Sequence, residues 1–297
     1  MGVKKFLALT MISLCITGIQ APVIYAKETN AYVMDSDKDT FQNNLQIKRI
    51  LLNGTADDIR QLIKNMDVNS DYGCTSMLNK VTQALVSSEN PDLQPEETIK
   101  KVKLLIDAGA DVNLETCKMT PLAMAVTLPE QGRQLEKKFL TILNDNINSV
   151  DGICTVSGIN KPCKLTTEKE RQQMRKELRE IFAEEQKKME PYIIEIITLL
   201  LDNGADINKS SHGVAPLIFA ANTPDESGTA LLEFLLSKGA DPNVKDFQGN
   251  TPLFVANYAD NTKAIKLLIK AGADTKIRNN EGLLYHEFRR GEYYLNL

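Results

Sequence analysis

Apolar residues recur along this chain in short runs with helical spacing, and each run ends at the same pattern. The runs read VKLLIDAG, IITLLLDNG, LLEFLLSKG and IKLLIKAG, and the last residue of each opens a Gly-Ala-Asp phrase, at positions 109, 204, 239 and 272. Leucines and isoleucines three or four positions apart form one apolar stripe on a helix, and a neighbouring element must cover that stripe. The pattern therefore predicts amphipathic helices that end at the glycine.

The residues around each glycine indicate how one helix ends and the next begins. Glycine adopts the left-handed conformation just past a helix end at the least cost. The aspartate that follows can accept hydrogen bonds from nearby backbone N–H groups in a turn. Thr-Pro-Leu at 120–122 and at 251–253 suits the start of a helix, because threonine caps, proline fits the first turn and leucine points inward. Ala-Pro-Leu at 215–217 lacks only the threonine.

The spacing of these phrases predicts a stack of similar units. The last three lie 35 and 33 residues apart, and a fixed period near 33 residues is the signature of repeat architectures. The phrases and their spacing resemble the ankyrin repeat over most of residues 41–290. The resemblance implies an all-α ankyrin-repeat solenoid of stacked helix-turn-helix units, in which a hairpin loop called a finger precedes each pair of helices. One such unit cannot bury its apolar face alone, so at least three must stack.

Weaker copies of the phrase extend the alignment on both sides. The aligned loop asparagines are Asn69, Asn113, Asn148, Asn208 and Asn243. With the final finger near residue 276, this alignment predicts six fingers and six to seven helix pairs. The first pair, residues 41–64, has no finger before it, and Thr55 with Asp58 forms a variant of the capping box at its second helix. Residues 282–286 depart from Gly-x-Thr-Pro-Leu and are expected to open an atypical last helix.

The first 26 residues have the features of a secretory signal peptide. Lys4 and Lys5 precede an apolar stretch, and Ala26 ends a segment that resembles a cleavage site. The stretch of about 14 residues is shorter than the roughly 20 that a membrane-spanning helix needs, which favours a leader over a membrane anchor. We expect residues 1–26 to be removed, 27–40 to be a flexible segment and 41–297 to form the repeat domain. The leader looks bacterial, so we expect the mature protein in the periplasm or outside the cell.

Cysteine usage fits an exported protein. Removal of the leader leaves Cys74, Cys117, Cys154 and Cys163, and an even count favours disulfides, for which three pairings are possible. Cys154 and Cys163 flank a segment that can fold back as a hairpin, so a bond between them is the simplest choice and leaves Cys74 with Cys117 on a neighbouring finger. A metal site is the alternative, but there is no Cys-x-x-Cys and there are only two histidines. We expect neither a metal nor a cofactor.

Residues 149–190 interrupt the repeat pattern. After the cysteine hairpin, residues 166–190 interleave acidic and basic side chains, many of them four positions apart, which is typical of a solvated helix. Pro191 is expected to end or kink this helix. We interpret the insertion as an enlarged repeat with a long finger, a long first helix over 166–190 and a second helix from Pro191 to Asn203. The insertion either lengthens the stack or forms an arm that contacts a partner.

The sequence contains no recognisable catalytic pattern. Neither His212 nor His286 stands beside a serine or cysteine in a nucleophile motif, and the chain has no glycine-rich phosphate loop. The net charge is −4, and loss of Lys4 and Lys5 makes it −6. An acidic chain without a basic stripe argues against nucleic acid and anionic membranes as partners. We expect a non-catalytic monomer, without a membrane span in the mature chain, that binds another protein.

The resemblance implies a binding face built from finger tips and first helices. On this chain the face comprises Lys209, Ser211, His212, Lys245, Phe247, Gln248, Tyr258, Arg278 and Asn279. Phe247 is typical of an interface hot spot, unless its side chain folds back onto the neighbouring finger. Three functions remain open because a fold does not decide among them: a periplasmic binding scaffold, a secreted effector that engages a host protein, and, as a third hypothesis, an enzyme. The leader favours the scaffold.

Overall fold

The computed structural model describes residues 38–70, 75–87, 94–116, 119–146, 153–156, 159–162, 168–223 and 226–288. Helices in these ranges follow one another in pairs. The pairs are α3 (Lys38–Asn53) with α4 (Ala56–Leu62), α5 (Met77–Ser87) with α6 (Pro95–Asp107), α7 (Pro121–Asn146) with α8 (Glu168–Asp202), α9 (Pro216–Ala221) with α10 (Glu226–Ser237), and α11 (Pro252–Tyr258) with α12 (Thr262–Lys270). Two short strands, β1 (Ile153–Val156) and β2 (Ile159–Pro162), pair antiparallel between α7 and α8.

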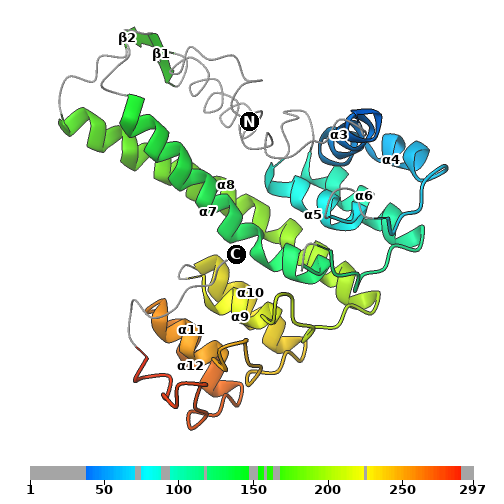
Figure 1. Ribbon diagram of the computed structural model, residues 1–297. Coiled ribbons are helices and arrows are strands. Elements are labelled where there is room, and N and C mark those ends of the chain that lie inside the picture. The colour runs from blue at the N-terminus through cyan, green and yellow to red at the C-terminus, as the bar shows by residue number, and fades with distance from the viewer. Residues whose placement is uncertain are drawn as a thin grey trace.

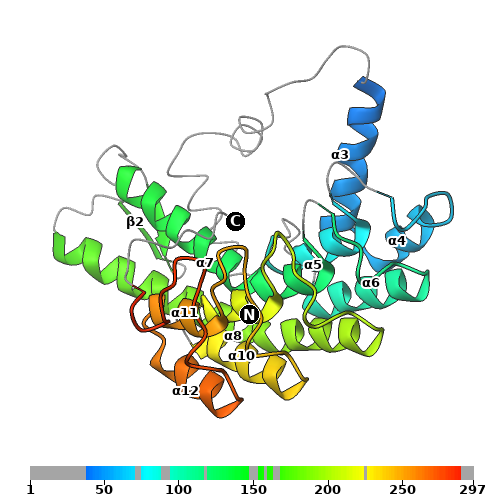
Figure 2. The same cartoon turned by 60° about the horizontal axis from the view of Figure 1, so that its bottom comes forward.

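The helices stack in two layers. The first helices of the pairs pack in the order α3, α5, α7, α9 and α11, and the second helices in the order α4, α6, α8, α10 and α12. Figure 1 shows the pairs following one another from the blue N-terminal end to the orange C-terminal end, and Figure 2 shows α6, α8, α10 and α12 in succession. The all-α solenoid that the sequence predicts is confirmed.

The helix ends confirm the role of the glycines. Gly109 and Gly204 have φ angles of 89° and 88°, in the left-handed region that glycine tolerates best. Beyond the first of them, the N–H of Ala110 donates to the carbonyl of Leu105 at 2.9 Å, which satisfies a carbonyl that the helix leaves without a partner. At the other end of the motif the threonine cap is present in α7, where the N–H of Ala123 donates to Thr120 Oγ1 at 3.2 Å. In α11 the expected cap is absent, because the Thr251 side chain makes no capping hydrogen bond.

One leucine position carries the packing of the second-helix layer. The leucine four residues before each glycine is fully buried in all four copies of the phrase. These residues are Leu105, Leu200, Leu235 and Leu268, each 0% exposed. Each therefore lies in the continuous apolar core that the two layers share, and the period of the core follows the period of the phrase.

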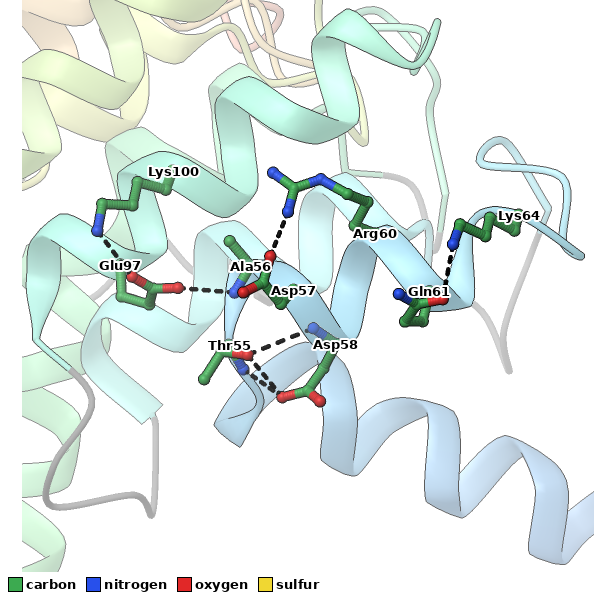
Figure 3. Close-up of polar contacts among 9 residues, drawn as sticks. All are labelled: Thr55, Ala56, Asp57, Asp58, Arg60, Gln61, Lys64, Glu97 and Lys100. Atoms are coloured by element: carbon green, nitrogen blue, oxygen red, sulfur yellow. Dashed lines mark hydrogen bonds and ion pairs between the residues drawn. The ribbon is translucent and has the colours of Figure 1, made fainter.

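Polar contacts attach the first helix pair to the second (Figure 3). Thr55 and Asp58 form the predicted capping box at the start of α4, with the Thr55 N–H donating to Asp58 Oδ2 at 2.8 Å. Hydrogen bonds from Thr55 hold the pKa of the Asp58 carboxyl below its ordinary value. Glu97 of α6 accepts a hydrogen bond from the N–H of Ala56 at 2.7 Å. The start of α4 is thus satisfied partly by its own cap and partly by the next repeat.

A buried lysine is hydrogen-bonded to the carbonyls at the C-terminal end of α3. Lys101 of α6 is 0% exposed. Its Nζ atom donates to the carbonyls of Leu51 at 3.0 Å and Gly54 at 3.1 Å, and lies 3.4 Å from the carbonyl of Leu52. A cation at a helix C-terminus meets the negative end of the helix dipole and the carbonyls that lack partners. Burial nevertheless lowers the pKa of Lys101 to about 8.

The loop asparagines form a ladder between neighbouring fingers. Asn69 donates to the carbonyl of Gly109 at 3.1 Å and accepts from the N–H of Asp111 at 2.8 Å. Asn243 makes the same two contacts with Gly272 and Asp274, at 3.3 Å and 2.7 Å. An asparagine side chain carries both a donor and an acceptor, so one residue can hold two backbone groups of the next finger.

The ladder corrects the predicted organisation of the insertion. Asn113 donates to the carbonyl of Gly204 at 2.8 Å and accepts from the N–H of Asp206 at 2.8 Å. The finger that follows Asn113 is therefore the one at 204–208, and the prediction of a finger at Asn148 between them is wrong. Asn148 itself lies outside the described residues. Within the described ranges the structure has five fingers and five helix pairs, rather than six fingers and six to seven pairs.

The enlarged repeat consists of α7, α8 and the hairpin between them. α7 is its first helix, whereas the sequence predicted a first helix over 166–190. Figure 1 shows α7 and α8 in green, extending beyond the neighbouring pairs, with β1 and β2 in the segment that joins them. The extra length is thus added at the turn between the two helices, at the end of the repeat opposite the fingers.

Pro191 lies inside α8, which runs from Glu168 to Asp202 without a break. The prediction of a separate second helix that begins at Pro191 is therefore wrong. Proline removes one helical hydrogen bond because it has no N–H. Pro191 and Lys187, whose carbonyl loses that bond, are both exposed, so water can satisfy the carbonyl. Packing of the second half of α8 between α6 and α10 keeps the helix continuous.

The described chain ends on a turn instead of the predicted last helix. Residues 285–287 form a turn, and Phe288 is 4% exposed. The Asn257 side chain donates to the carbonyls of Tyr285 at 2.9 Å and Phe288 at 3.1 Å. These bonds and the edge-on contact of Phe288 with Phe254, at 5.8 Å between ring centroids, fix this segment against α11 without a helix.

Candidate functional site

The fingers are short hairpins whose side chains alternate between inside and outside. Bridges join Thr116 with Met119, Ser211 with Val214 and Arg278 with Leu284. Successive side chains of an extended segment point to opposite faces. In the fingers that follow α8, α10 and α12 the outward positions are exposed and the position between them is buried. The exposed set, which we call the finger patch, consists of Ser210, His212, Lys245, Phe247, Arg278 and Asn280.

The buried finger positions hold the fingers together. Ser211 is 0% exposed and accepts a hydrogen bond from the N–H of Thr120 at 3.0 Å. Asn279 is 7% exposed and donates to Asn250 Oδ1 at 3.0 Å. Buried polar groups are stable when they are hydrogen-bonded, so these side chains join fingers and do not face a partner. This corrects the prediction that placed Ser211 and Asn279 on the binding face. Their alternation with exposed neighbours was the signal that the alignment overlooked.

Phe247 lies at the centre of the finger patch. Its side chain is 56% exposed. A methyl group added to Gly213 of the preceding finger would lie 3.4 Å from Cβ of Phe247. On the other side, Asn280 of the following finger donates to the carbonyl of Phe247 at 3.2 Å. Phe247 thus lies between the two neighbouring fingers, with more than half of the residue exposed.

The other predicted binding residues differ in their exposure and in the contacts that they make. Lys245 and His212 are exposed, and His212 adopts a φ of 54° in the turn of its finger. Lys209 is half-buried and donates to the carbonyl of Asn113 at 2.8 Å, so it supports the preceding finger. Tyr258 is half-buried, with its ring centroid 6.3 Å from that of Phe288.

Of the remaining two predicted residues, Gln248 lies beside the patch and Arg278 belongs to it. Gln248 is half-buried, and its carbonyl accepts from the N–H of Asn280 at 2.9 Å. Arg278 donates to the carbonyl of Gly282 at 2.5 Å and lies 3.6 Å from Glu287. The bond between Gln248 and Asn280 at the tips and the bond between Asn243 and Asp274 at the base hold these two fingers in register.

The predicted disulfides fall mainly on undescribed positions. Cys74, Cys117 and Cys163 lie outside the described residues, and Cys154 lies in β1, opposite Lys161 of β2. The hairpin expected between Cys154 and Cys163 is confirmed by the pairing of these strands. Among the residues with described side chains, no group of three His, Cys, Asp or Glu gathers to hold a metal ion. None of the described helices is long and apolar enough to cross a membrane.

Comparison with known proteins matches this architecture. The sequence model of the family described as ankyrin repeats (three copies) matches residues 190–279. Residues 190–279 contain ankyrin repeats. Over 96 residues, 30% of this chain, it is 35% identical to ankyrin repeat and SOCS box protein 6 of Pongo abelii. Over 52 residues, 16% of this chain, it is 48% identical to a putative ankyrin repeat protein of Rickettsia felis.

These relatives share only part of their length with the chain. The matches cover 22% of the Pongo abelii protein and 23% of the Rickettsia felis protein. An ankyrin repeat-containing protein of Schizosaccharomyces pombe is 33% identical over 90 residues, 30% of this chain and 42% of its own length. The chain thus spans less than half of each, and the likeness concerns the repeats rather than any whole protein.

Proposed function

We propose that this ankyrin-repeat protein is a non-catalytic scaffold that binds another protein through the finger patch. The observation that carries the proposal is Phe247, an aromatic side chain that is 56% exposed and flanked by polar finger residues. Aromatic residues surrounded by a polar rim are typical of interface hot spots. Repeat stacks form extended surfaces of this kind because each unit adds one finger to the row.

The test compares two exposed apolar side chains of the same repeats. Phe247→Ala truncates the finger patch, and Ile269→Ala truncates a side chain of α12 that is 45% exposed and lies outside it. Proteins captured by the wild-type chain are identified, and their affinities are measured for both variants. We expect Phe247→Ala to weaken the main partner by more than about 2 kcal/mol and Ile269→Ala to leave it unchanged. Equal losses of partner affinity in the two variants would contradict a binding site on the fingers.

A second variant separates the finger patch from the long helix pair. Removal of residues 150–165 deletes the hairpin between α7 and α8 and leaves every residue of the patch in place. We expect the partner to bind this variant normally. If the deletion abolished binding and Phe247→Ala did not, the site would lie on the arm formed by α7, α8 and the hairpin, and the regular repeats would only support it.

We also propose that the protein is exported and acts in the periplasm. Support comes from the leader-like residues 1–26 and from the even number of cysteines that remain without them. N-terminal sequencing of protein from the envelope fraction should begin at Lys27. A mature protein that still begins at Met1 would contradict export. Fractionation of the native cells would distinguish this location from the alternative, a secreted effector that engages a host protein.

A further inference from the structure

The charge of the finger patch is opposite to that of the chain. The whole chain carries a net charge of −4. The six outward positions of the patch carry Lys245, Arg278 and His212 and not one carboxylate. The cations Lys245 and Arg278 stand on neighbouring fingers beside the exposed Phe247. A cationic rim around an apolar centre, on an otherwise acidic chain, is a local feature that net charge alone would not indicate.

The register of the fingers places these groups side by side. Lys245 and Arg278 occupy the same outward position of two fingers that are hydrogen-bonded at base and tip, from Asp274 to Asn243 and from Asn280 to Gln248. Phe247 occupies the next outward position of the Lys245 finger. One extended segment of a partner laid across the fingers can therefore meet both cations and the ring.

Carboxylates near the patch leave this charge largely available. Asp246 is 6% exposed and accepts from the N–H groups of Gln248 and Asn250, both at 2.8 Å. Glu287 lies 3.6 Å from Arg278 and accepts from the N–H of Leu284 at 2.7 Å, so it offsets part of the charge of Arg278. Exposed ion pairs of this kind are weak, and Lys245 has no carboxylate at an adjacent outward position. Lys245 is therefore the cation that an incoming carboxylate would meet first.

We propose that the finger patch binds a short acidic segment of its partner in which carboxylates flank one bulky apolar side chain. The apolar side chain covers Phe247, and the carboxylates pair with Lys245 and Arg278. Opposite charges across an interface set specificity and association rate, while the buried apolar contact supplies affinity. The inference rests on the proposed function, because it names the partner chemistry of that same surface.

A peptide selection tests the chemistry without assuming a sequence. A displayed library of random twelve-residue peptides is panned on the full-length chain and on two variants, Lys245→Glu and Lys266→Glu. Lys266 is exposed on α12, outside the patch, so both variants change the net charge equally. We expect wild type and Lys266→Glu to enrich Asp and Glu around a Phe, Trp or Leu, and Lys245→Glu to lose that enrichment. Selected peptides should bind Lys245→Glu and Phe247→Ala at least tenfold more weakly, and more weakly in high salt.

Three outcomes would overturn the inference. The first is a wild-type selection without acidic enrichment. The second is an equal loss of peptide binding in Lys245→Glu and Lys266→Glu, which would reflect net charge alone. The third is a 20-nucleotide single-stranded DNA that binds as tightly as the peptides and depends equally on Lys245, which would indicate a general anion surface.

Failure of this inference can be distinguished from failure of the proposed function. Enriched peptides that need Phe247 but carry no acidic residue would overturn the acidic chemistry and leave the protein-binding function standing. A captured partner whose affinity is unchanged by Phe247→Ala would contradict the protein-binding function of the patch. Thermal melts of all variants check that each is folded.

Discussion

Asn113 and Asp206 are hydrogen-bonded to each other although 93 positions separate them in the chain: the N–H of Asp206 donates to Asn113 Oδ1 at 2.8 Å. The same bond joins Asn69 to Asp111 and Asn243 to Asp274, across 42 and 31 positions. The long unit between Asn113 and Asn208 therefore occupies one step of the stack. Its extra residues lie in α7, α8 and their connection, and the row of fingers continues past them without interruption.

The asparagine ladder should contribute measurably to stability. Asn113→Ala removes both hydrogen bonds to the next finger and leaves the Gly204 carbonyl and the Asp206 N–H without this partner. We expect a loss of about 1–3 kcal/mol in the free energy of unfolding, measured by urea denaturation. Ser210→Ala, an exposed change in the same row of fingers, should lie within about 0.5 kcal/mol of wild type. Similar values for the two variants would show that the ladder does not hold the fingers.

Buried leucines at the repeat period should dominate stability. Leu200 is 0% exposed in α8, and Leu200→Ala should cost about 2–5 kcal/mol because it removes packed atoms and leaves a cavity. Lys187→Ala, at an exposed position of the same helix, should change the unfolding free energy by less than about 0.5 kcal/mol. Thermal and urea unfolding would measure both. Equal shifts in melting temperature would contradict the assignment of Leu200 to the buried face of α8 and Lys187 to its exposed face.

Lys101 should make stability depend on pH in the alkaline range. Burial lowers the pKa of Lys101 to about 8 from an ordinary value of 10.5. Between these values the unfolded chain binds more protons than the folded chain, so the contribution of Lys101 to stability rises with pH. Relative to Lys101→Met, the wild type should gain about 1–3 kcal/mol between pH 8 and pH 10.5. Urea midpoints at intervals across this range measure the difference.

The neighbouring lysine is the matched control for that experiment. Lys100 is exposed and pairs with Glu97 at 3.1 Å. Because Lys100→Met removes an exposed side chain and leaves Lys101 in place, its unfolding free energy should run parallel to that of the wild type over the same interval. A Lys101→Met curve that is also parallel would show that the amine inside the fold titrates as it does in water.

Non-reducing peptide mapping should find two disulfides, Cys154 with Cys163 and Cys74 with Cys117. The first would close the β1–β2 hairpin and stabilise by roughly 2–3 kcal/mol in the chain-entropy model. For the second, Ser76 and Thr116 give support, because the N–H of Ser76 donates to Thr116 Oγ1 at 3.0 Å. Cys74 stands two residues before Ser76, and Cys117 follows Thr116. Free thiols at all four positions in the exported protein would refute both pairings and the argument for an oxidising compartment.

Where the sequence misled, a contact between distant segments decided the outcome. Asn148 matches the loop asparagines as well as Asn69 does, but Asn113 bonds to the finger at 204–208. Pro191 is a strong signal for a helix end, yet burial of the following residues between α6 and α10 outweighs one missing hydrogen bond. Ser211 and Asn279 alternate with exposed residues in the same loops, and their hydrogen bonds to neighbouring fingers show that their side chains are inside.

The sequence alone determined the repeat unit of this protein. Glycine in a left-handed turn, a leucine stripe at helical spacing and a proline at the first helical turn are local requirements, and each recurs at a readable interval. The tertiary structure alone decided which finger follows which, that the insertion extends a single helix pair, and that Lys101 is buried against the end of α3. These depend on hydrogen bonds and packing between residues about 50 to 93 positions apart, and local propensity carries no information about partners at that distance.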